Sequence, residues 1–297
     1  MKKYNKLGKY KIKKGILILL LYIGFTGFVF WILFPFVWVF ISSFMNQGEL
    51  GAVPPHWIPH QPTLDNYSSV ILGRASAQLV HGTTEKTKVI LPTMFNSFYI
   101  SFIVSMFNLF IGGLAAYSIS RFKTRVNSGL YLIFLISRVL PPMGMIIPFF
   151  VIFRRLNLIN SPWALIISYN LLILPLVIWL LKGYFDSVPV DVEESALVDG
   201  ATRFQTFTKI LLPVAIPGFV ATFIMSFMEC WSEFFFSLTL TDEMTLPPVL
   251  AGFQNMEQIN WTTLAAATVL TVVIPITLAL VLQKYIISGL TAGAMKG

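Results

Sequence analysis

Three charged side chains lie inside long apolar stretches of the sequence: Arg138, Glu229 and Glu233. A charge at the centre of a bilayer costs about 2.5–3.5 kcal/mol on insertion scales, so such groups face a cavity, the interior of a helix bundle or one another. Glu229 and Glu233 are four residues apart and therefore share a helix face. We expect the three residues to line a polar cavity, with Glu229 near Arg138. A purely structural ion pair between two helices is the alternative interpretation.

Five acidic residues lie between two long apolar stretches, in the segment 186–213. Within it, Asp191 is a good N-cap for a short helix that begins directly after it. Glu193 and Glu194 then fall in the first turn, where the helix dipole stabilises anions. Gly200 is typical of the residue that follows a helix end.

A second amphipathic helix is predicted over 202–212, and Pro213 is expected to end it at the membrane. Its apolar face consists of Phe204, Phe207, Ile210 and Leu211. The two helices together present an apolar ridge that is expected to fill a groove on a partner protein, formed by Ala196, Leu197, Phe204 and Phe207. Lipid is the alternative partner, but helices that rest on lipid are rich in Lys and Arg, and this segment has more acids than cations.

The sequence contains no set of residues with the spacing of a catalytic or metal site. His56 and His60 are separated by Pro59, and no acid or cysteine is expected to complete a metal site with them. Cys230 is the single cysteine, so an internal disulfide is excluded. The phosphate-binding pattern Gly-x4-Gly-Lys-Ser/Thr is missing as well. We therefore expect no catalytic residues, no metal and no cofactor in this chain, and no ATP binding by the chain alone.

The composition indicates a membrane protein. The chain has 297 residues, of which 56% are apolar and only 11% are charged, whereas soluble domains contain about 25% charged residues. Lipid is the environment that accepts such a surface, and helices are the elements that satisfy their own backbone hydrogen bonds in it. This composition excludes an ordinary soluble domain, a disulfide scaffold and a nucleic-acid-binding domain, although the net charge is +8.

Charge-free windows predict an all-α integral membrane protein with six transmembrane helices, because about 20 apolar residues cross a bilayer. In chain order, the six expected spans are residues 16–45, a segment within 89–120, residues 128–153, a segment within 156–181, residues 214–236 and residues 264–284. Six spans place both termini on the same side. Fifteen of the 21 Lys and Arg residues lie on that side, five on the other and Arg138 within a span. By the positive-inside rule both termini are therefore expected in the cytoplasm of a multi-pass protein of the cell membrane.

The inner segment resembles the signature of binding-protein-dependent ABC importer permeases, which is Glu-Ala-Ala, three residues, Gly, nine residues and Ile-x-Leu-Pro. Here the pattern reads Glu194-Ser195-Ala196, then Gly200, then Ile210-x-Leu212-Pro213, with Ser195 as the one departure. The outer stretch 54–67 and the sequence Trp231-Ser232-Glu233-Phe234 are similar to those of carbohydrate permeases. The C-terminal residues 289–297 resemble the end of the MalG-like, maltose-type permeases.

This resemblance implies a type I ABC importer permease fold and a role in ATP-driven sugar or oligosaccharide import. The implied partners are a second permease subunit in a heterodimer, a cytoplasmic ATPase dimer that binds the ATP, an extracellular solute-binding protein and membrane lipid, with no nucleic acid. In that family the inner segment couples the permease to the ATPase. The implied coupling residues are Asp191, Glu193, Glu194, Ser195, Ala196, Asp199, Gly200, Phe204, Phe207, Ile210, Leu212 and Pro213. The C-terminal residues Thr291, Gly293 and Lys296 are implied to contact the ATPase.

The expected organisation follows from the spans and the resemblance together. Residues 1–15 form a basic cytoplasmic tail, 16–45 the first transmembrane helix and 46–92 an extracellular loop. Residues 93–286 form a permease domain of five helices with the coupling loop 186–213, and 287–297 form a cytoplasmic tail. Three alternative functions stay open. The first is a permease for another solute, such as a phosphorylated polyol. The others are a proton-coupled secondary transporter, which would show inverted repeats, and a membrane-embedded enzyme, for which no catalytic residues are present.

Overall fold

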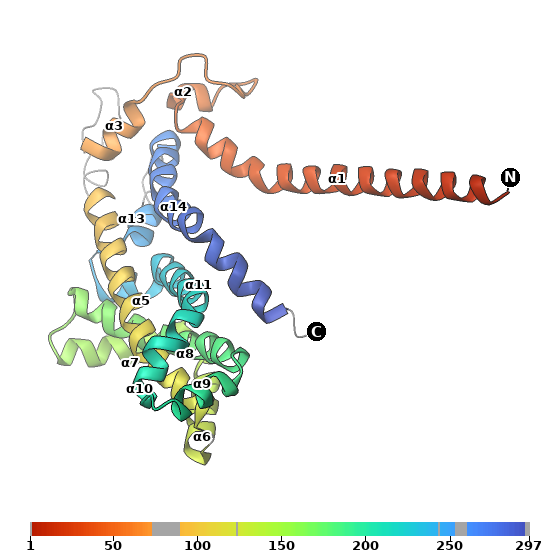
Figure 1. Cartoon of the computed structure of the whole chain (residues 1–297). Coiled ribbons are helices and arrows are strands. Elements are labelled where there is room, and N and C mark those ends of the chain that lie inside the picture. The colour runs from red at the N-terminus through yellow and green to blue at the C-terminus, as the bar shows by residue number, and fades with distance from the viewer. Residues whose placement is uncertain (1, 73–89, 123, 243, 253–259, 295–297) are drawn as a thin grey trace.

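The structure is a computed structural model that describes residues 2–72, 90–122, 124–242, 244–252 and 260–294, with side chains described between residues 15 and 285. All regular elements in these ranges are helices (Figure 1). They are α1 (Lys2–Ser42), α2 (Gln47–Leu50), α3 (Asp65–Leu72), α5 (Ile90–Arg121), α6 (Arg125–Ser137), α7 (Pro142–Arg155), α8 (Pro162–Ser187), α9 (Val190–Val198), α10 (Arg203–Thr206), the π-helical turn η1 (Phe207–Leu211), α11 (Leu212–Trp231), α12 (Phe235–Leu240), α13 (Leu246–Gly252) and α14 (Trp261–Ala294). The all-α prediction is confirmed.

Five helical segments are long and apolar enough to cross a membrane: Gly15–Ser42, Ile90–Arg121, Pro162–Ser187, Arg203–Trp231 and Trp261–Tyr285. A sixth span results if α6 and α7 are counted as one bent segment, which agrees with the six predicted spans. Figure 1 shows α2 and α3 at one end of the bundle, here called the α3 end, and α6, α9 and α10 at the other, here called the α9 end.

The third predicted span is not one continuous helix, which corrects the expectation for 128–153. α6 ends at Ser137, α7 begins at Pro142, and the two axes are bent by 99°. Pro141 and Pro142 explain the break, because each proline lacks an N–H and disfavours helical backbone at the residue before it. Pro141 accordingly has extended backbone, with φ −66° and ψ 125°.

The fifth predicted span, 214–236, also has different limits. The helix begins earlier, since α10, η1 and α11 follow one another without a gap from Arg203 to Trp231. It ends earlier too, because residues 232–234 are not helical and α12 begins at Phe235. The break falls within the sequence that resembles the carbohydrate permeases.

The centre of the bundle is formed by α5, α8 and α11, whose buried apolar side chains make one continuous core. Small residues allow these helices to approach closely, as is usual between membrane helices. A Cβ atom at Gly218 of α11 would lie 2.4 Å from Cγ of Tyr184 on α8, and one at Gly112 of α5 would lie 2.7 Å from Cγ1 of Val177. Both glycines are therefore required by packing.

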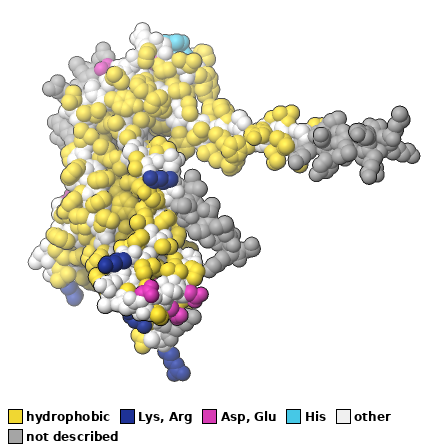
Figure 2. Space-filling model, viewed as in Figure 1, with side chains coloured by type: hydrophobic (Ala, Val, Ile, Leu, Met, Phe, Trp, Pro, Cys, Tyr) yellow, Lys and Arg dark blue, Asp and Glu magenta, His cyan; other side chains and the backbone are white. Residues whose placement is uncertain are grey.

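Helix α1 extends away from the other helices (Figure 1). In its described part, no side chain before Ser42 is buried, and Figure 2 shows apolar side chains along the projecting helix. Near its C-terminal end α1 contacts α14 and the ring of Trp57. A helix that is apolar on all sides and packs on its own chain only at one end is stable only in lipid or against another apolar surface.

The chain after α1 folds back on the end of that helix. Asn66 of α3 is buried, and its Nδ2 donates hydrogen bonds to the backbone oxygens of Ser43 and Met45, each at 2.9 Å. Its Oδ1 accepts a hydrogen bond from Thr262 Oγ1 of α14 at 3.0 Å. One amide thus joins α1, α3 and α14, which explains an Asn in the outer stretch that the sequence analysis singled out.

Candidate functional site

The α9–α10 hairpin, residues 189–206, projects at the α9 end (Figure 1). Gly200 ends α9 with φ +87°, a conformation that side chains rarely adopt. The amide of Ala201 donates to the oxygen of Ala196 at 3.0 Å, and that of Gly200 to Leu197 at 3.1 Å. This pair of bonds is a Schellman motif, so Gly200 ends the helix where the sequence predicts.

The second arm of the hairpin begins with a capping box. Thr202 Oγ1 accepts a hydrogen bond from the Gln205 backbone amide at 3.2 Å, and Gln205 Oε1 accepts one from the Thr202 amide at 2.8 Å. Caps on both sides of the turn satisfy backbone groups that would otherwise be free. The hairpin is therefore defined by its own sequence as well as by its contacts with the bundle.

Two local predictions for this segment are wrong. Pro189, not Asp191, is the N-cap of α9, and Asp191 lies within the first turn. Pro213 does not end a helix: it lies in the first turn of α11, which continues from α10 through η1. Pro213 lacks the N–H that would bond to the oxygen of Lys209, so the turn before it widens to the π form and the helix continues.

A buried ion pair joins the hairpin to the bundle. Arg121, the last residue of α5, donates from Nε to Oε1 of Glu193 on α9, and each side chain is only 7% exposed. Arg121 Nη2 also donates to the backbone oxygen of Val188 at 3.2 Å, and Tyr117 Oη donates to Glu193 Oε2 at 3.4 Å. Removing one partner of such a pair would leave an uncompensated buried charge.

The buried Arg121–Glu193 ion pair is also connected to α8, through a chain of hydrogen-bonded polar side chains. Arg121 Nη1 donates to Ser120 Oγ at 3.1 Å, and Ser120 Oγ donates to Asp186 Oδ1 at 2.6 Å. Lys182 Nζ lies 2.5 Å from Asp186 Oδ2. The ends of α5, α8 and α9 are thereby linked.

The apolar ridge that we predicted on the hairpin is only partly present. Ala196 is buried, and Phe207 turns inward, with its ring centroid 4.9 Å from that of Tyr117. Phe204 is 72% exposed, as predicted, and Val198 is 88% exposed, which the sequence did not suggest. α9 and α10 are too short for helical periodicity to distinguish their inner and outer faces.

The exposed face of the hairpin is therefore defined by the structure. Its exposed residues are Pro189, Val190, Asp191, Val192, Glu194, Ser195, Val198, Asp199, Gly200, Thr202, Arg203, Phe204 and Gln205. Figure 2 shows acidic side chains gathered at this end of the molecule among apolar ones. Of the other predicted coupling residues, Ile210 and Leu212 are half-buried in the continuous helix and Pro213 is exposed.

The second site is a hollow of about 290 Å³ between α6, α7, α8 and α11, with a mostly apolar lining that includes the charged side chains of Arg138, Glu229 and Glu233. Arg138 and Glu229 lie on its wall, with Arg138 Nη2 3.9 Å from Glu229 Oε1, so the predicted proximity of these two residues is confirmed. Both helix breaks, at 138–141 and at 232–234, contribute to the wall as well. Broken helices at membrane depth are tolerated where they line a cavity or are covered by protein.

Glu233 lines the same hollow and also has a structural role. Its carboxylate accepts hydrogen bonds from the backbone amides of Phe236 at 2.9 Å and Ser237 at 3.2 Å, at the start of α12. Tyr169 Oη of α8 donates to Glu233 Oε2 at 2.8 Å. The carboxylate thus caps α12 and fixes the break after α11, while Glu229 keeps its carboxylate toward the hollow.

The predicted C-terminal contact residues are placed only in part. Thr291 and Gly293 belong to the backbone of α14, and their side chains are not described; Lys296 lies outside the described residues.

Sequence reasoning missed Arg121 and Tyr169 as members of these sites. Arg121 counted only as one of the cations that indicate orientation, although its position at the end of a long apolar stretch placed it near the inner segment. Tyr169 gave no signal that distinguishes it from other aromatic residues in the spans.

Comparison with known proteins gives related chains over most of this sequence. Residues 108–291 match the family described as "Binding-protein-dependent transport system inner membrane component". The trehalose/maltose transport system permease protein MalG of Thermococcus litoralis is 33% identical over 285 residues, 94% of this chain and 97% of that one. The sulfoquinovosyl glycerol transport system permease protein SmoH of Agrobacterium fabrum is 32% identical over 268 residues, 89% of each chain.

The fold is also similar to a solved structure. A chain of the crystal structure of a bacterial ABC transporter involved in the import of the acidic polysaccharide alginate superposes with a TM-score of 0.73. The match covers 91% of this chain and 96% of that chain, at 20% sequence identity. The two chains share a helical membrane fold.

Proposed function

Since the chain belongs to the family of binding-protein-dependent transport system inner membrane components, we propose that it is the permease subunit of a sugar or oligosaccharide importer. The curated relatives named for trehalose, maltose and sulfoquinovosyl glycerol transport support this substrate class. The protein is a multi-pass component of the plasma membrane with the type I ABC importer permease fold. The hollow at the two helix breaks, with Arg138, Glu229 and Glu233 on its wall, is the single structural feature that best supports a path for a hydroxyl-rich solute.

The chain acts with other subunits in this proposal. A second permease completes the translocation path, two cytoplasmic ATPase subunits bind and hydrolyse ATP, and an extracellular binding protein delivers the sugar. The chain itself performs no chemical reaction, and the ATP is bound by the partner subunits. Its α9 end and both termini face the cytoplasm, as the distribution of Lys and Arg indicates.

The exposed face of the α9–α10 hairpin is the part that contacts the ATPase. Phe204 and Val198 supply exposed apolar area, and the exposed charged residues of the hairpin are the three acids Asp191, Glu194 and Asp199 and one cation, Arg203. Anionic lipid headgroups would repel these acids, which favours a protein partner. The Arg121–Glu193 pair then transmits movement of the hairpin to α5.

Replacing Glu229 by Gln is expected to reduce sugar uptake at least about tenfold, a change of about 1.4 kcal/mol. The substitution keeps the shape of the side chain and removes the negative charge beside Arg138 on the wall of the hollow. Uptake of labelled sugar and membrane abundance should be measured together, with Asp65→Asn, an exposed carboxylate at the α3 end, as the control. Normal uptake at normal abundance would rule out a role for Glu229 in the path.

The proposed function is tested by reconstitution in vesicles. Vesicles that contain this chain, the second permease and the ATPase are expected to accumulate sugar only when the binding protein is outside and ATP is inside. Without the ATPase, uptake should fall to the level of empty vesicles. Uptake that persists without the ATPase and stops when the proton gradient is collapsed would instead identify a secondary transporter. ATP-driven uptake of a phosphorylated polyol but of no sugar would correct the substrate class.

A further inference from the structure

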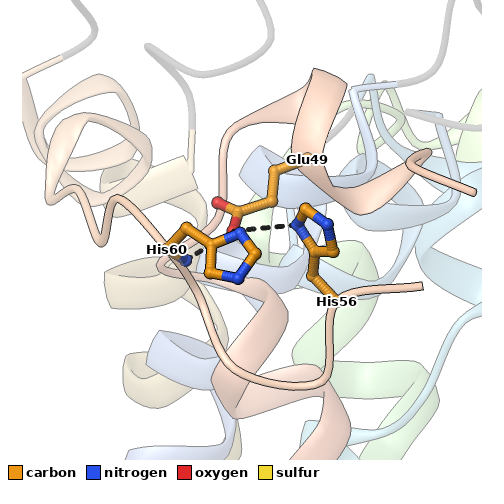
Figure 3. Close-up of side chains that lie close together, drawn as sticks. All are labelled: Glu49, His56 and His60. Atoms are coloured by element: carbon orange, nitrogen blue, oxygen red, sulfur yellow. Dashed lines mark hydrogen bonds and ion pairs between the residues drawn. The ribbon is translucent and has the colours of Figure 1, made fainter. Parts of the chain in front are cut away.

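Three potential metal ligands converge at the α3 end, on the segment that joins α1 to α3. They are Glu49 of α2 and two histidines of the following loop, His56 and His60 (Figure 3). One ligand atom from each residue lies within 4.8 Å of the ligand atoms of the other two. We expected no acid beside these histidines; that expectation is wrong, because the loop returns to α2 and brings Glu49 there.

The distances between these atoms suit a small tetrahedral cation. Glu49 Oε1 lies 3.4 Å from His56 Nδ1 and 3.7 Å from His60 Nδ1. Zinc is bound at about 2.0–2.1 Å by histidine nitrogen and at a similar distance by carboxylate oxygen, so two ligands of a tetrahedral site are about 3.4 Å apart. Both distances from the carboxylate are therefore close to the spacing that a shared ion requires, and all three ligand atoms lie within 4.8 Å of one another.

The chemistry of the three groups also favours a cation between them. His56 Nδ1 is buried and makes no hydrogen bond of good geometry, although it faces the carboxylate. A neutral imidazole that carries its proton on Nε2 presents a lone pair at Nδ1, and two such lone pairs beside a carboxylate repel each other. A divalent cation removes this repulsion and satisfies all three groups at once.

The ligands are held in place before any ion binds. The backbone amide of His60 donates to Glu49 Oε1 at 2.5 Å, and the side chain of Glu49 is only 10% exposed. Trp57, next to His56, packs against α1, with its ring centroid 5.2 Å from that of Trp38. The two imidazole rings lie edge to face, with centroids 4.0 Å apart. Ligands whose orientation is fixed by such neighbours bind metal more tightly than free side chains.

We propose that Glu49, His56 and His60 form a binding site for one Zn²⁺ ion, with water as the fourth ligand. His60 is the exposed member of the set, with 70% of its side chain accessible, so the open position faces solvent. Two imidazoles and one carboxylate are a ligand set that zinc uses when a position stays open. The ion fastens the loop to α2. This site does not depend on the proposed transport function.

The test uses the assembled transporter, purified with a tag that contains no histidine and freed of metal by a chelator. Titration with Zn²⁺ alone, followed by calorimetry and by metal analysis after dialysis, is expected to show one ion for each copy of this chain. His56→Asn and His60→Asn should each weaken binding at least about tenfold, and the double variant should abolish it. His81→Asn, which changes the one other histidine of the chain, is the control and should bind as the wild type does.

A second measurement shows whether the variants are folded. The thermal unfolding midpoint in chelator should be the same for the wild type and both single variants, and Zn²⁺ should raise it only for the wild type and the control. Ca²⁺ and Mg²⁺ should not compete, because they prefer oxygen ligands. The proposal is wrong if the folded wild type binds no Zn²⁺, if the double variant binds it as tightly as the wild type does, or if His81→Asn alone removes it.

Discussion

Phe204→Asp is expected to release the ATPase from the transporter. Phe204 is 72% exposed on the α9–α10 hairpin and packs on little of its own chain, so the folded permease should tolerate the change. An aromatic residue at the centre of an interface contributes about 2–4 kcal/mol, which corresponds to a loss of about 30- to 1000-fold in affinity. The new carboxylate also lies among the acids of the exposed face and adds repulsion.

The measurement is co-purification of the ATPase with the tagged permease pair, together with ATP-driven uptake in vesicles. Ile58→Asp is the matched control, because Ile58 is an equally exposed apolar residue in the loop at the α3 end. The control should retain the ATPase, while Phe204→Asp should lose both the ATPase and uptake. A Phe204→Asp transporter that keeps its full complement of ATPase would show that the hairpin is not the contact.

Arg121→Ala is expected to destabilise the attachment of the hairpin by about 3–5 kcal/mol. The substitution leaves Glu193 charged, buried and without its ionic partner, and it removes the hydrogen bond to the oxygen of Val188. The hairpin should then separate from α5, so uptake and ATPase activity should become uncoupled. Protease cleavage within residues 189–206 and the ratio of ATP hydrolysed to sugar imported both report this change.

The double variant Arg121→Met with Glu193→Gln separates the effect of the unpaired buried charge from the effect of the lost side-chain volume. It removes both charges and keeps most of the side-chain volume, so it should recover most of the lost stability although not all of the coupling. Glu194→Gln, an exposed acid on the same helix, is the control for a lost charge and should remain resistant to protease. If the single and double variants are equally sensitive to protease, the ion pair does not fix the hairpin.

The sequence was sufficient for features that depend on composition and on residues close in the chain. Charge-free windows predict the positions of the membrane-spanning helices, because a bilayer requires a similar apolar length of every span. Gly200 was recognised as a helix end, since a positive φ almost requires glycine. The cost of a charge in lipid predicts that Arg138 and Glu229 avoid the lipid, and their proximity is one of the arrangements that it favours.

Features that depend on tertiary contacts could not be predicted in this way. Arg121 and Glu193 are 72 positions apart, and no local pattern indicates that they pair. Glu49 meets His60 because a proline-rich loop turns back on α2, a path that residue spacing does not encode. The extent of the helix at Pro213 depended on a π-helical turn, which local propensity does not predict.

The uninterrupted helix from Arg203 to Trp231 has a mechanical consequence. Its 29 residues form a lever roughly 40 Å long, at about 1.5 Å for each residue. One end carries Phe204 and the other carries Glu229, so one continuous helix joins the hairpin to the hollow, with the π-helical turn between them. A tilt of about 5° about the far end displaces the near end by roughly 3–4 Å, given that length. In the proposed importer, a displacement of the hairpin by the ATPase would therefore reach the hollow along this helix itself.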